Sequence, residues 1–297
     1  MLWIWVLGIF LVCAAPANAV TSTGNGEVRG SVLNLQQQQR EEPASVLQKL
    51  AQAEVVYLGE THDRPADHQA QLDIIQALQR LRPHLTIAME MFQRPYQSVL
   101  DRYLAGQLTE TELQDLSQYK KRWGYSWEFY APVLRFAKDH NLPVIALNTP
   151  TEVTRKTARA GLGSLTLADR RFIPPLSAIV LGPTGYRQRL QQIYTDSHHG
   201  DRSNRFESFF EAQVLWDETM AERITQTLQQ RPGTLVVVLV GQGHILYGDG
   251  IPARVARRLQ GGQPRSRPLT QWSVLLNADD PTPQSRPPLA DYIWYSP

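Results

Sequence analysis

Four titratable side chains follow apolar, strand-like runs of the sequence. They are Glu60, His62, Glu90 and His244, and the runs before them span residues 55–58, 85–89 and 235–240. A carboxylate beside an imidazole can bind a divalent metal ion, or it can orient the imidazole and favour its charged form. In open parallel sheets, ligands bind outside the carboxyl ends of the strands. We therefore expect these four side chains to meet at one rim as a two-histidine, two-carboxylate cluster.

Two of the strand endings repeat one pattern. VVYLGETH at 55–62 and VVLVGQGH at 237–244 each place Gly-x-x-His after an apolar run. A glycine at such an exit permits a sharp turn or a close backbone approach. Glu60 and His62 are two residues apart, so they share a side of the chain if it continues extended. The alternative is structural, since a histidine after a strand can bond a buried carbonyl or cap a helix.

Short apolar runs alternate with helical patterns along the chain. Strand-like runs lie at 55–58, 85–89, 143–147 and 235–240, and helical patterns at 64–82, 95–105, 109–118, 128–140 and 205–230. The runs are continuously apolar, which implies cover on both faces. The sequence therefore predicts an α/β fold: a largely parallel β-sheet flanked by helices, with a helical cap or insertion at about 95–140 and 161–200. Runs at 272–276 and 291–295 are expected at the edge of the sheet.

The N-terminal residues have the pattern of a secretory signal. MLWIWVLGIFLVCAAPANA is apolar and ends in Ala-x-Ala, so we expect cleavage after residue 19, with membrane anchoring as the alternative. Val12, before the single cysteine Cys13, does not fit a lipid-attachment site. We expect residues 20–43 to be a flexible polar leader and residues 44–297 to form one α/β domain. The mature protein is then expected to be secreted across the inner membrane into the periplasm.

The composition argues against two classes of function. Because the only cysteine lies inside the predicted signal, the mature chain would have no disulfide, no cysteine-bound zinc and no thiol nucleophile. The net charge of +2, without a basic block that contains aromatic residues, argues against nucleic acid as a partner.

Five segments, taken in order, carry a resemblance to a known family. They are VVYLGETHD, IAMEMF, WGYSWEFYAPVLRFAKDHNLPVIALN, EAQVLWDETMA and VVVLVGQGHI. Together they resemble the ChaN-like haem-binding proteins of the haem-binding uptake and Tiki superfamily, over roughly residues 45–250. The resemblance implies an α/β domain in an extracytoplasmic protein linked to iron or haem acquisition. It also implies a tyrosine as haem ligand, at a position that stays open here. Other branches of the superfamily resemble metal-dependent proteases or esterases.

Haem requires an apolar slot, an axial ligand and cations for its propionates. YKKRWGYSWEFY at 119–130 supplies aromatic and basic residues together, including Tyr125 and Tyr130. GYRQRLQQIYTDSHHG at 185–200 offers a second wall, with Tyr186 and His198. In the long helix, Gln213 and Asp217 are spaced to share a face that could look toward the same rim. Each set has a structural alternative: aromatic residues that cap the sheet, an exposed histidine pair, and a solvated helix face.

The leading hypothesis is an extracytoplasmic haem-binding protein of an uptake system that is not an enzyme. Under it, Tyr125, Tyr130, Tyr186, His198, Gln213 and Asp217 are the candidate haem-site residues. The alternative is a metal-dependent hydrolase, a protease or esterase, in which Glu60, His62, Glu90 and His244 hold Mn, Co or Zn and activate water. A third reading is an envelope scaffold whose polar groups only bond each other. The expected partners are haem or another small ligand, with a homodimer and a membrane-associated uptake partner left open.

Overall fold

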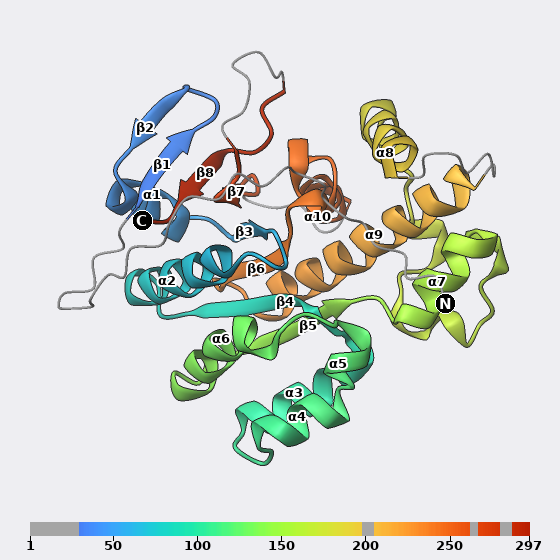
Figure 1. Cartoon of the computed structure of the whole chain (residues 1–297), viewed down its shortest axis with the longest axis horizontal. Coiled ribbons are helices and arrows are strands. Elements are labelled where there is room, and N and C mark those ends of the chain that lie inside the picture. Colours follow the sequence, from blue (N-terminus) through green and yellow to red (C-terminus); the bar gives the residue numbers. More distant parts are fainter. Residues whose placement is uncertain (1–29, 198–204, 262–266, 280–286) are drawn as a thin grey trace.

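The computed structural model describes residues 30–197, 205–261, 267–279 and 287–297 and shows one mixed β-sheet between helices (Figure 1). Within these residues the sheet has eight strands in the order β2-β1-β8-β7-β3-β6-β4-β5. They are β1 (Ser31–Asn34), β2 (Gln39–Glu41), β3 (Val55–Glu60), β4 (Leu85–Gln93), β5 (Val144–Asn148), β6 (Leu235–Gly241), β7 (Gln271–Leu276) and β8 (Tyr292–Tyr295). The predicted α/β fold with a largely parallel sheet is confirmed.

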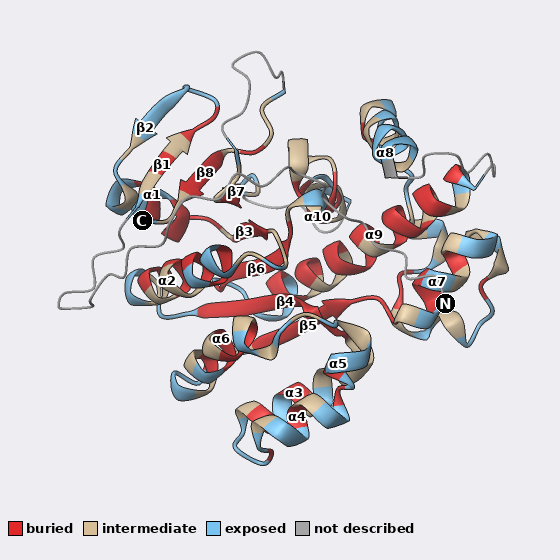
Figure 2. Ribbon diagram, in the orientation of Figure 1, coloured by how far each residue is buried: buried red, intermediate tan, exposed pale blue. Residues whose placement is uncertain are grey.

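The central strands run parallel, so their carboxyl ends meet at one edge of the sheet. β3 pairs with β6 and β7, and β4 pairs with β5 and β6, all in the parallel sense. Every residue of β3, β4, β5 and β6 is buried (Figure 2). A parallel sheet covered on both faces requires such continuously apolar strands, which explains the pattern in the sequence.

Helices cover both faces of the sheet. They are α1 (Pro43–Ala51), α2 (Pro65–Leu81), α3 (Gln97–Leu104), α4 (Glu110–Leu116), α5 (Tyr119–Arg122), α6 (Trp127–Asp139), α7 (Thr151–Ala160), α8 (Thr184–Ser197), α9 (Phe206–Gln230) and α10 (Ile251–Gln260). Helices α1, α2 and α6 pack against Val56 and Leu58 on one face. Helices α9 and α10 pack against Val55 and Tyr57 on the other. Successive residues of β3 thus enter opposite layers of the core.

Two expectations about the ends of the domain are wrong. Residues 31–41 do not form a flexible leader, because β1 and β2 make an antiparallel hairpin that pairs β1 with β8 and buries Val32. The hairpin also displaces β7 and β8 from the edge of the sheet, where β2 and β5 lie instead. The predicted signal at 1–19 and the leader residues 20–29 lie outside the described part of the chain.

The helical segments predicted as a cap or insertion have two different roles. Residues 94–139 form the 3₁₀-helix η1 (Arg94–Tyr96) and α3 to α6, and Leu100 and Leu134 join the main core. This segment is the crossover between the parallel strands β4 and β5. After β5 come α7, the 3₁₀-helices η2 (Leu162–Ser164), η3 (Asp169–Phe172) and η4 (Leu176–Ala178), and α8. Helix α8 stands away from the sheet beside the start of α9 (Figure 1), where Tyr186 and Phe210 share a separate apolar cluster.

Candidate functional site

Three neighbouring strands deliver the predicted side chains to one edge of the sheet. Glu60 is the last residue of β3, and Glu90 lies in β4. His244 ends the 3₁₀-helix η5 (Gln242–His244), which follows β6 directly. The strand around Glu90 continues to Gln93, four residues beyond the predicted run, through an irregular pairing with β5 between Met89 and Gln93. The four side chains therefore meet at a common rim, called here the rim cluster: Glu60, His62, Glu90 and His244.

Two glycines allow the chain exits to approach each other closely. A Cβ atom on Gly59 would lie 2.6 Å from Ile245 Cδ1 and 3.2 Å from Gln242 Cα. A Cβ atom on Gly241 would lie 2.8 Å from His62 Cε1 and 3.0 Å from its Nε2. A side chain at either position would therefore require a neighbour to move: the Ile245 side chain at Gly59, and the His62 ring at Gly241. The two Gly-x-x-His exits thus pack on one another, as the repeated glycines suggested.

Glu60 is a fully buried carboxylate that accepts hydrogen bonds from three side chains. Tyr130 Oη donates to Oε1 at 2.6 Å, and Gln71 Nε2 donates to Oε2 at 2.6 Å. His62 Nδ1 lies 2.8 Å from Oε1 and donates to it when protonated. His68 Nδ1 lies 3.5 Å from Oε2. A buried carboxylate is stable only when such donors compensate for the lost water. Glu60 therefore fixes the orientation of the His62 ring.

His244 is held by a second carboxylate, which comes from helix α9. His244 Nδ1 lies 2.6 Å from Asp217 Oδ1. Tyr186 Oη, from helix α8, donates to Asp217 Oδ2 at 2.6 Å. Arg254 Nη1 lies 3.8 Å from the same oxygen. The cap helix is thereby connected to the rim cluster through a buried hydrogen bond, and Asp217 orients His244 as Glu60 orients His62.

Glu90 lies between the two histidines. Its Oε2 accepts the backbone N–H of Gly241 at 2.8 Å, and its Oε1 lies 3.5 Å from His244 Nε2. Burial opposes the charge of Glu90, but the positive charges of His244 and His62 and the Gly241 hydrogen bond hold its pKa at about 2. Burial also opposes the charge of His244, yet Glu90 and Asp217 raise its pKa to about 10. Glu90 and His244 are therefore a charged pair at neutral pH.

The charge of His62 follows the same balance. Burial lowers its pKa, but the hydrogen bond that it donates to Glu60 and the charges of Glu90 and Glu60 raise it above the usual value overall. The imidazole of His62 is 26% exposed. The other side chains of the rim cluster are less exposed: Glu60 0%, Glu90 4% and His244 13%. With Nδ1 bonded to Glu60, the Nε2 of His62 is the atom that can meet a ligand.

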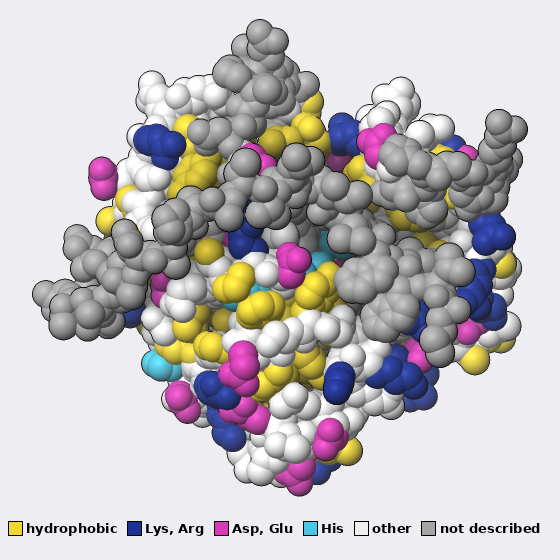
Figure 3. All heavy atoms as spheres, in the orientation of Figure 1, with side chains coloured by type: hydrophobic (Ala, Val, Ile, Leu, Met, Phe, Trp, Pro, Cys, Tyr) yellow, Lys and Arg dark blue, Asp and Glu magenta, His cyan; other side chains and the backbone are white. Residues whose placement is uncertain are grey.

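Aromatic rings surround the exposed edge of His62. The Trp123 ring packs edge-on against it with centroids 4.8 Å apart, and the Tyr125 ring lies at 4.9 Å. On the other side of the rim cluster, Trp216 packs edge-on against His244 at 5.9 Å. In the space-filling view, hydrophobic side chains gather around histidine atoms in the middle of the displayed face (Figure 3). The rim thus combines apolar rings with a few polar atoms, as small-ligand sites do.

The predicted haem-site residues do not occupy equivalent positions. Tyr125 is half-buried beside His62, whereas Tyr130 and Tyr186 are buried with their hydroxyl groups donated to carboxylates. Asp217 contacts His244. Gln213 lies one turn before Asp217 and is nearly buried, and within the described residues its amide has no hydrogen bond to the rim cluster. His198 lies outside the described residues.

Two residues of the site were missed or misjudged by sequence reasoning. His68 is not among the candidates named from the sequence, but it is buried, stacks on Phe129 with centroids 4.5 Å apart and approaches Glu60. Gln71 was not considered, although it lies one helical turn after His68 on α2. A polar pair at that spacing, directly after a strand that ends in a carboxylate, was the available signal.

The candidate metal ligands do not make a ready metal centre. Within the described residues, no group of three or more His, Cys, Asp or Glu side chains is placed to hold a metal ion. The reason is visible at Glu60, whose two oxygens already accept bonds from Tyr130, Gln71 and His62. Glu60 therefore acts as a support for His62 rather than as a free ligand.

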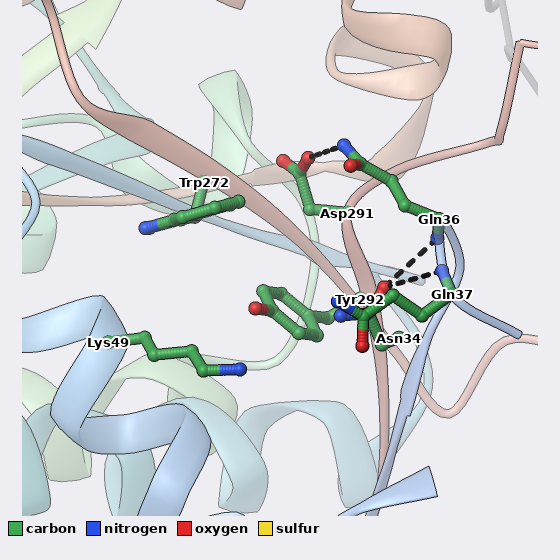
Figure 4. Close-up of a pocket in the computed structure, with 7 residues that line it drawn as sticks. All are labelled: Asn34, Gln36, Gln37, Lys49, Trp272, Asp291 and Tyr292. Carbon is green, nitrogen blue, oxygen red and sulfur yellow. Dashed lines mark hydrogen bonds between the residues drawn. The ribbon is translucent and has the colours of Figure 1, made fainter. Parts of the chain in front are cut away.

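A separate surface pocket lies at the other ends of the strands. It is lined by Asn34, Gln36, Gln37, Lys49, Trp272, Asp291 and Tyr292 (Figure 4). Trp272 pairs with Val56, near the beginning of β3. Asn34 Oδ1 accepts the backbone N–H groups of Gln36 and Gln37, each at 3.0 Å. Much of the polar lining is thus occupied by local turn bonds, and the rim cluster is the better candidate site.

The fold and the rim define an α/β protein with two carboxylate-held histidines at the carboxyl ends of parallel strands. The family described as haem-binding uptake, Tiki superfamily, ChaN, matches residues 46–255, and the chain belongs to this family. The structure is similar to that of ChaN of Campylobacter jejuni, solved with cofacially bound haem. The two have a TM-score of 0.70 and 18% identity, and the match covers 89% of this chain and 96% of that one.

A plant protein is also similar in sequence. Protein RETICULATA-RELATED 5, chloroplastic, of Arabidopsis thaliana is 29% identical over 273 residues, which is 84% of this chain. The match covers 35% of the plant protein, so this chain corresponds to about a third of its length.

Proposed function

We propose that the protein binds haem at the rim cluster, outside the cytoplasm, as part of iron or haem uptake. The observation that carries this proposal is the environment of His62. Its ring is the most exposed of the rim cluster, its Nδ1 is bonded to Glu60, and Trp123 and Tyr125 lie against it. Membership in the ChaN family and the haem-bound ChaN of Campylobacter jejuni support the proposal. Export through residues 1–19 is part of the proposal and rests on the sequence pattern.

The donor atoms at the rim suit haem iron. His62 offers an imidazole nitrogen and Tyr125 a phenol oxygen, both among the axial ligands that proteins use. Burial and the nearby carboxylates Asp63, Glu90 and Glu60 raise the pKa of Tyr125, so it is a neutral phenol in the free protein. A bound ferric iron would supply the positive charge that favours loss of this proton. Tyr125 is therefore the tyrosine that we assign to the haem.

The two buried tyrosines are assigned a supporting role. Burial and the charge of Glu60 raise the pKa of Tyr130 far above its usual value. Burial and the charge of Asp217 do the same for Tyr186. Ligation by either phenolate would break a 2.6 Å hydrogen bond to a buried carboxylate. Such a carboxylate is costly to leave without a donor, so we propose that both tyrosines position the histidines through Glu60 and Asp217.

Several buried polar atoms near the rim lack a partner among the described residues. They include Asn148 Oδ1 at the end of β5, Thr149 Oγ1 directly after it, and Trp216 Nε1 beside His244. Asn148 also donates to the backbone carbonyl of Glu90 at 2.9 Å, which places it next to the rim cluster. Native structures contain few such atoms, and they often mark the place of a ligand or an ordered water. This supports a ligand site at the rim.

An optical titration with haemin tests the proposal. The purified protein should show a saturable Soret change. Tyr125→Phe, which keeps the ring and removes the hydroxyl, should weaken binding by about tenfold or more, equal to ~1.4 kcal/mol. Tyr295→Phe is the matched control, because Tyr295 is also partly exposed but lies on β8, away from the rim. A non-saturable change, or equal affinities for the two variants, would count against this assignment.

A metal-dependent hydrolase is the second candidate. It is favoured by one observation: Glu90 lies beside both histidines, with His244 Nε2 at 3.5 Å and the charge of His62 acting on it. A metal would need the Nε2 atoms of both rings, and His244 is protonated in the free protein, so binding would release at least its proton. Elemental analysis after purification without chelators tests this. Stoichiometric Mn, Co or Zn that is lost in His62→Ala would favour the hydrolase over the haem protein.

A further inference from the structure

The segment from α7 to η3 carries the positive charge excess of the chain. Residues 151–172 contain five basic and two acidic residues, a net charge of +3, whereas the whole chain carries +2. The remaining residues therefore sum to a net charge of −1. Both acidic residues are paired, Glu152 with Arg122 at 3.0 Å and Asp169 with Lys156 at 2.6 Å. Lys and Arg side chains gather over α7 at the margin of the displayed face (Figure 3).

Three exposed arginines of this segment form no salt bridge among the described residues: Arg155, Arg159 and Arg171. The charge of Arg155 nevertheless acts on Glu152. Arg155 and Arg159 lie one helical turn apart on α7, so they share a face of the helix. The ion pair of Lys156 with Asp169 ties this helix to η3, where Arg171 lies. The guanidinium of Arg171 lies over the Phe172 ring, 5.1 Å from its centroid. The three charges therefore lie on two adjoining elements, α7 and η3.

A leucine projects from the chain between these two elements. Leu167 is 86% exposed, and the next large hydrophobic side chains among the described residues reach only 47%. The turn that carries it is held in place, since Asp169 Oδ2 accepts bonds from Thr166 N and Thr166 Oγ1, both at 2.7 Å. Leu165, two residues earlier, is buried against Val153 and Ile173. The exposure of Leu167 thus comes from a defined turn that presents one apolar side chain among cations.

We propose that this surface, made of Arg155, Arg159, Leu167 and Arg171, docks the protein onto an anionic lipid membrane. Lipid headgroups of negative charge attract each basic side chain near the surface, and an apolar side chain beside them can enter the acyl boundary. Among the described residues no helix is long and apolar enough to cross a membrane. The surface is distinct from the rim cluster, and it would hold the protein at a membrane without blocking His62.

Vesicle co-sedimentation tests this inference. The protein purified after export, with its N-terminus determined by mass spectrometry, is mixed with vesicles of pure phosphatidylcholine and with vesicles that contain phosphatidylserine. Binding should require phosphatidylserine and weaken as salt shortens the Debye length from about 30 Å at 0.01 M to about 8 Å at 0.15 M. Equal binding to both vesicle types, or no binding to either at low salt, would overturn the proposal; an acidic protein surface would then be the partner to seek.

Two triple variants distinguish binding through the proposed surface from binding that depends only on the net charge of the protein. Replacing Arg155, Arg159 and Arg171 together by alanine should reduce binding on the order of 100-fold at low salt, at about 1 kcal/mol for each cation. The control replaces three exposed cations elsewhere, Arg102, Lys120 and Arg231, and should retain binding. Equal losses in the two triple variants would overturn the proposal, because overall charge alone would then explain the binding.

A labelled variant tests the leucine without depending on the charge variants. The only cysteine of the chain is Cys13, so Leu167→Cys can carry an environment-sensitive fluorophore in the exported protein. Its emission should shift to the blue with phosphatidylserine vesicles and stay unchanged with phosphatidylcholine. A label at Ser98, which is exposed on α3, should not respond to either. No shift at position 167 while the protein co-sediments would show that another surface makes the contact.

Discussion

Asp217 is related to His244 as Glu60 is related to His62. Each carboxylate lies within hydrogen-bond distance of the Nδ1 atom of its histidine, at 2.6 and 2.8 Å, and each accepts a tyrosine hydroxyl at 2.6 Å. One carboxylate comes from the end of β3 and the other from α9. In both pairs the Nδ1 atom is occupied, which leaves Nε2 for Glu90 or a ligand. The rim cluster and Asp217 therefore form two similar carboxylate–histidine couples on either side of Glu90.

The Glu60 couple should control the protonation of His62. In Glu60→Gln the carboxylate charge is lost, so the pKa of His62 should fall toward its usual value. The amide group would also leave one of the buried donors without an acceptor, at a cost of about 1–3 kcal/mol. NMR titration of the imidazole signals and denaturant unfolding measure the two effects. Glu128→Gln, an exposed change on α6, should alter neither. An unchanged His62 pKa would contradict the assigned role of Glu60.

The His244 couple should make stability depend on alkaline pH. The pKa of His244 is raised from 6.5 to about 10 in the folded protein. The stabilisation from its charge is therefore fully present below pH 6.5 and is lost as the pH rises toward 10. The free energy of unfolding of the wild type should fall across this window. In His244→Asn this contribution should disappear, and in His84→Asn, a change at an exposed histidine, it should persist. Equal pH dependence of the wild type and His244→Asn would contradict the structure.

Gly241 should be required for the placement of His62. In Gly241→Ala the new methyl group would meet His62 Cε1 at 2.8 Å, so the imidazole or the backbone must move. We expect a loss of about 1–3 kcal/mol in stability, as for overpacked sites, and weaker haemin binding. Gly243→Ala is a close control, because two residues further along the chain a Cβ atom would meet no atom within 4 Å. If both variants bound haemin like the wild type, His62 would not be part of the haem site.

The Tyr186 hydroxyl should couple the cap helix to His244. Tyr186→Phe keeps the ring in its cluster with Phe210 and removes the donor to Asp217. Because a buried carboxylate then lacks a donor, unfolding should become easier by about 1–3 kcal/mol. Amide hydrogen exchange should also increase in α8. Tyr103→Phe, a change of another buried tyrosine, on α3, should leave exchange in α8 unchanged. Unchanged exchange in α8 of Tyr186→Phe would contradict this coupling.

The parallel core and the rim could be predicted because they depend on local patterns. Continuous apolar runs identified β3 to β6, and parallel strands necessarily bring Glu60 and His244 to one edge. The two Gly-x-x-His segments, which align in the sequence, do not take equivalent positions in the structure. The aligned glycines, Gly59 and Gly241, are not paired; the register sets Gly241 opposite Glu60. His62 lies in a turn two residues after the end of β3, whereas His244 ends the 3₁₀-helix η5.

Other features depend on contacts between distant segments and gave no local signal. The polar composition of residues 31–41 suggested a leader, because a short hairpin with only a few buried residues lacks the continuous apolar pattern of a core strand. Its pairing with β8 at the far end of the chain decides its structure. Likewise, no spacing rule predicts that the hydroxyl groups of Tyr130 and Tyr186 both donate hydrogen bonds to buried carboxylates. A tyrosine that donates to a buried carboxylate cannot be distinguished in the sequence from a tyrosine that binds haem. Only the hydrogen-bond partners in the structure distinguish the two.

A crystal structure of the protein grown with haemin tests the central claim most directly. The iron position is located by its anomalous scattering, and a parallel crystal is grown with Mn²⁺ to test the hydrolase alternative. The account predicts an iron peak at the exposed edge of His62, bonded to Tyr125 Oη or to His62 Nε2, with Glu60 and Asp217 still holding the two histidines. It would be contradicted by haem bound away from the rim cluster, or by a manganese peak between His62 and His244 with no ordered haem in the other crystal.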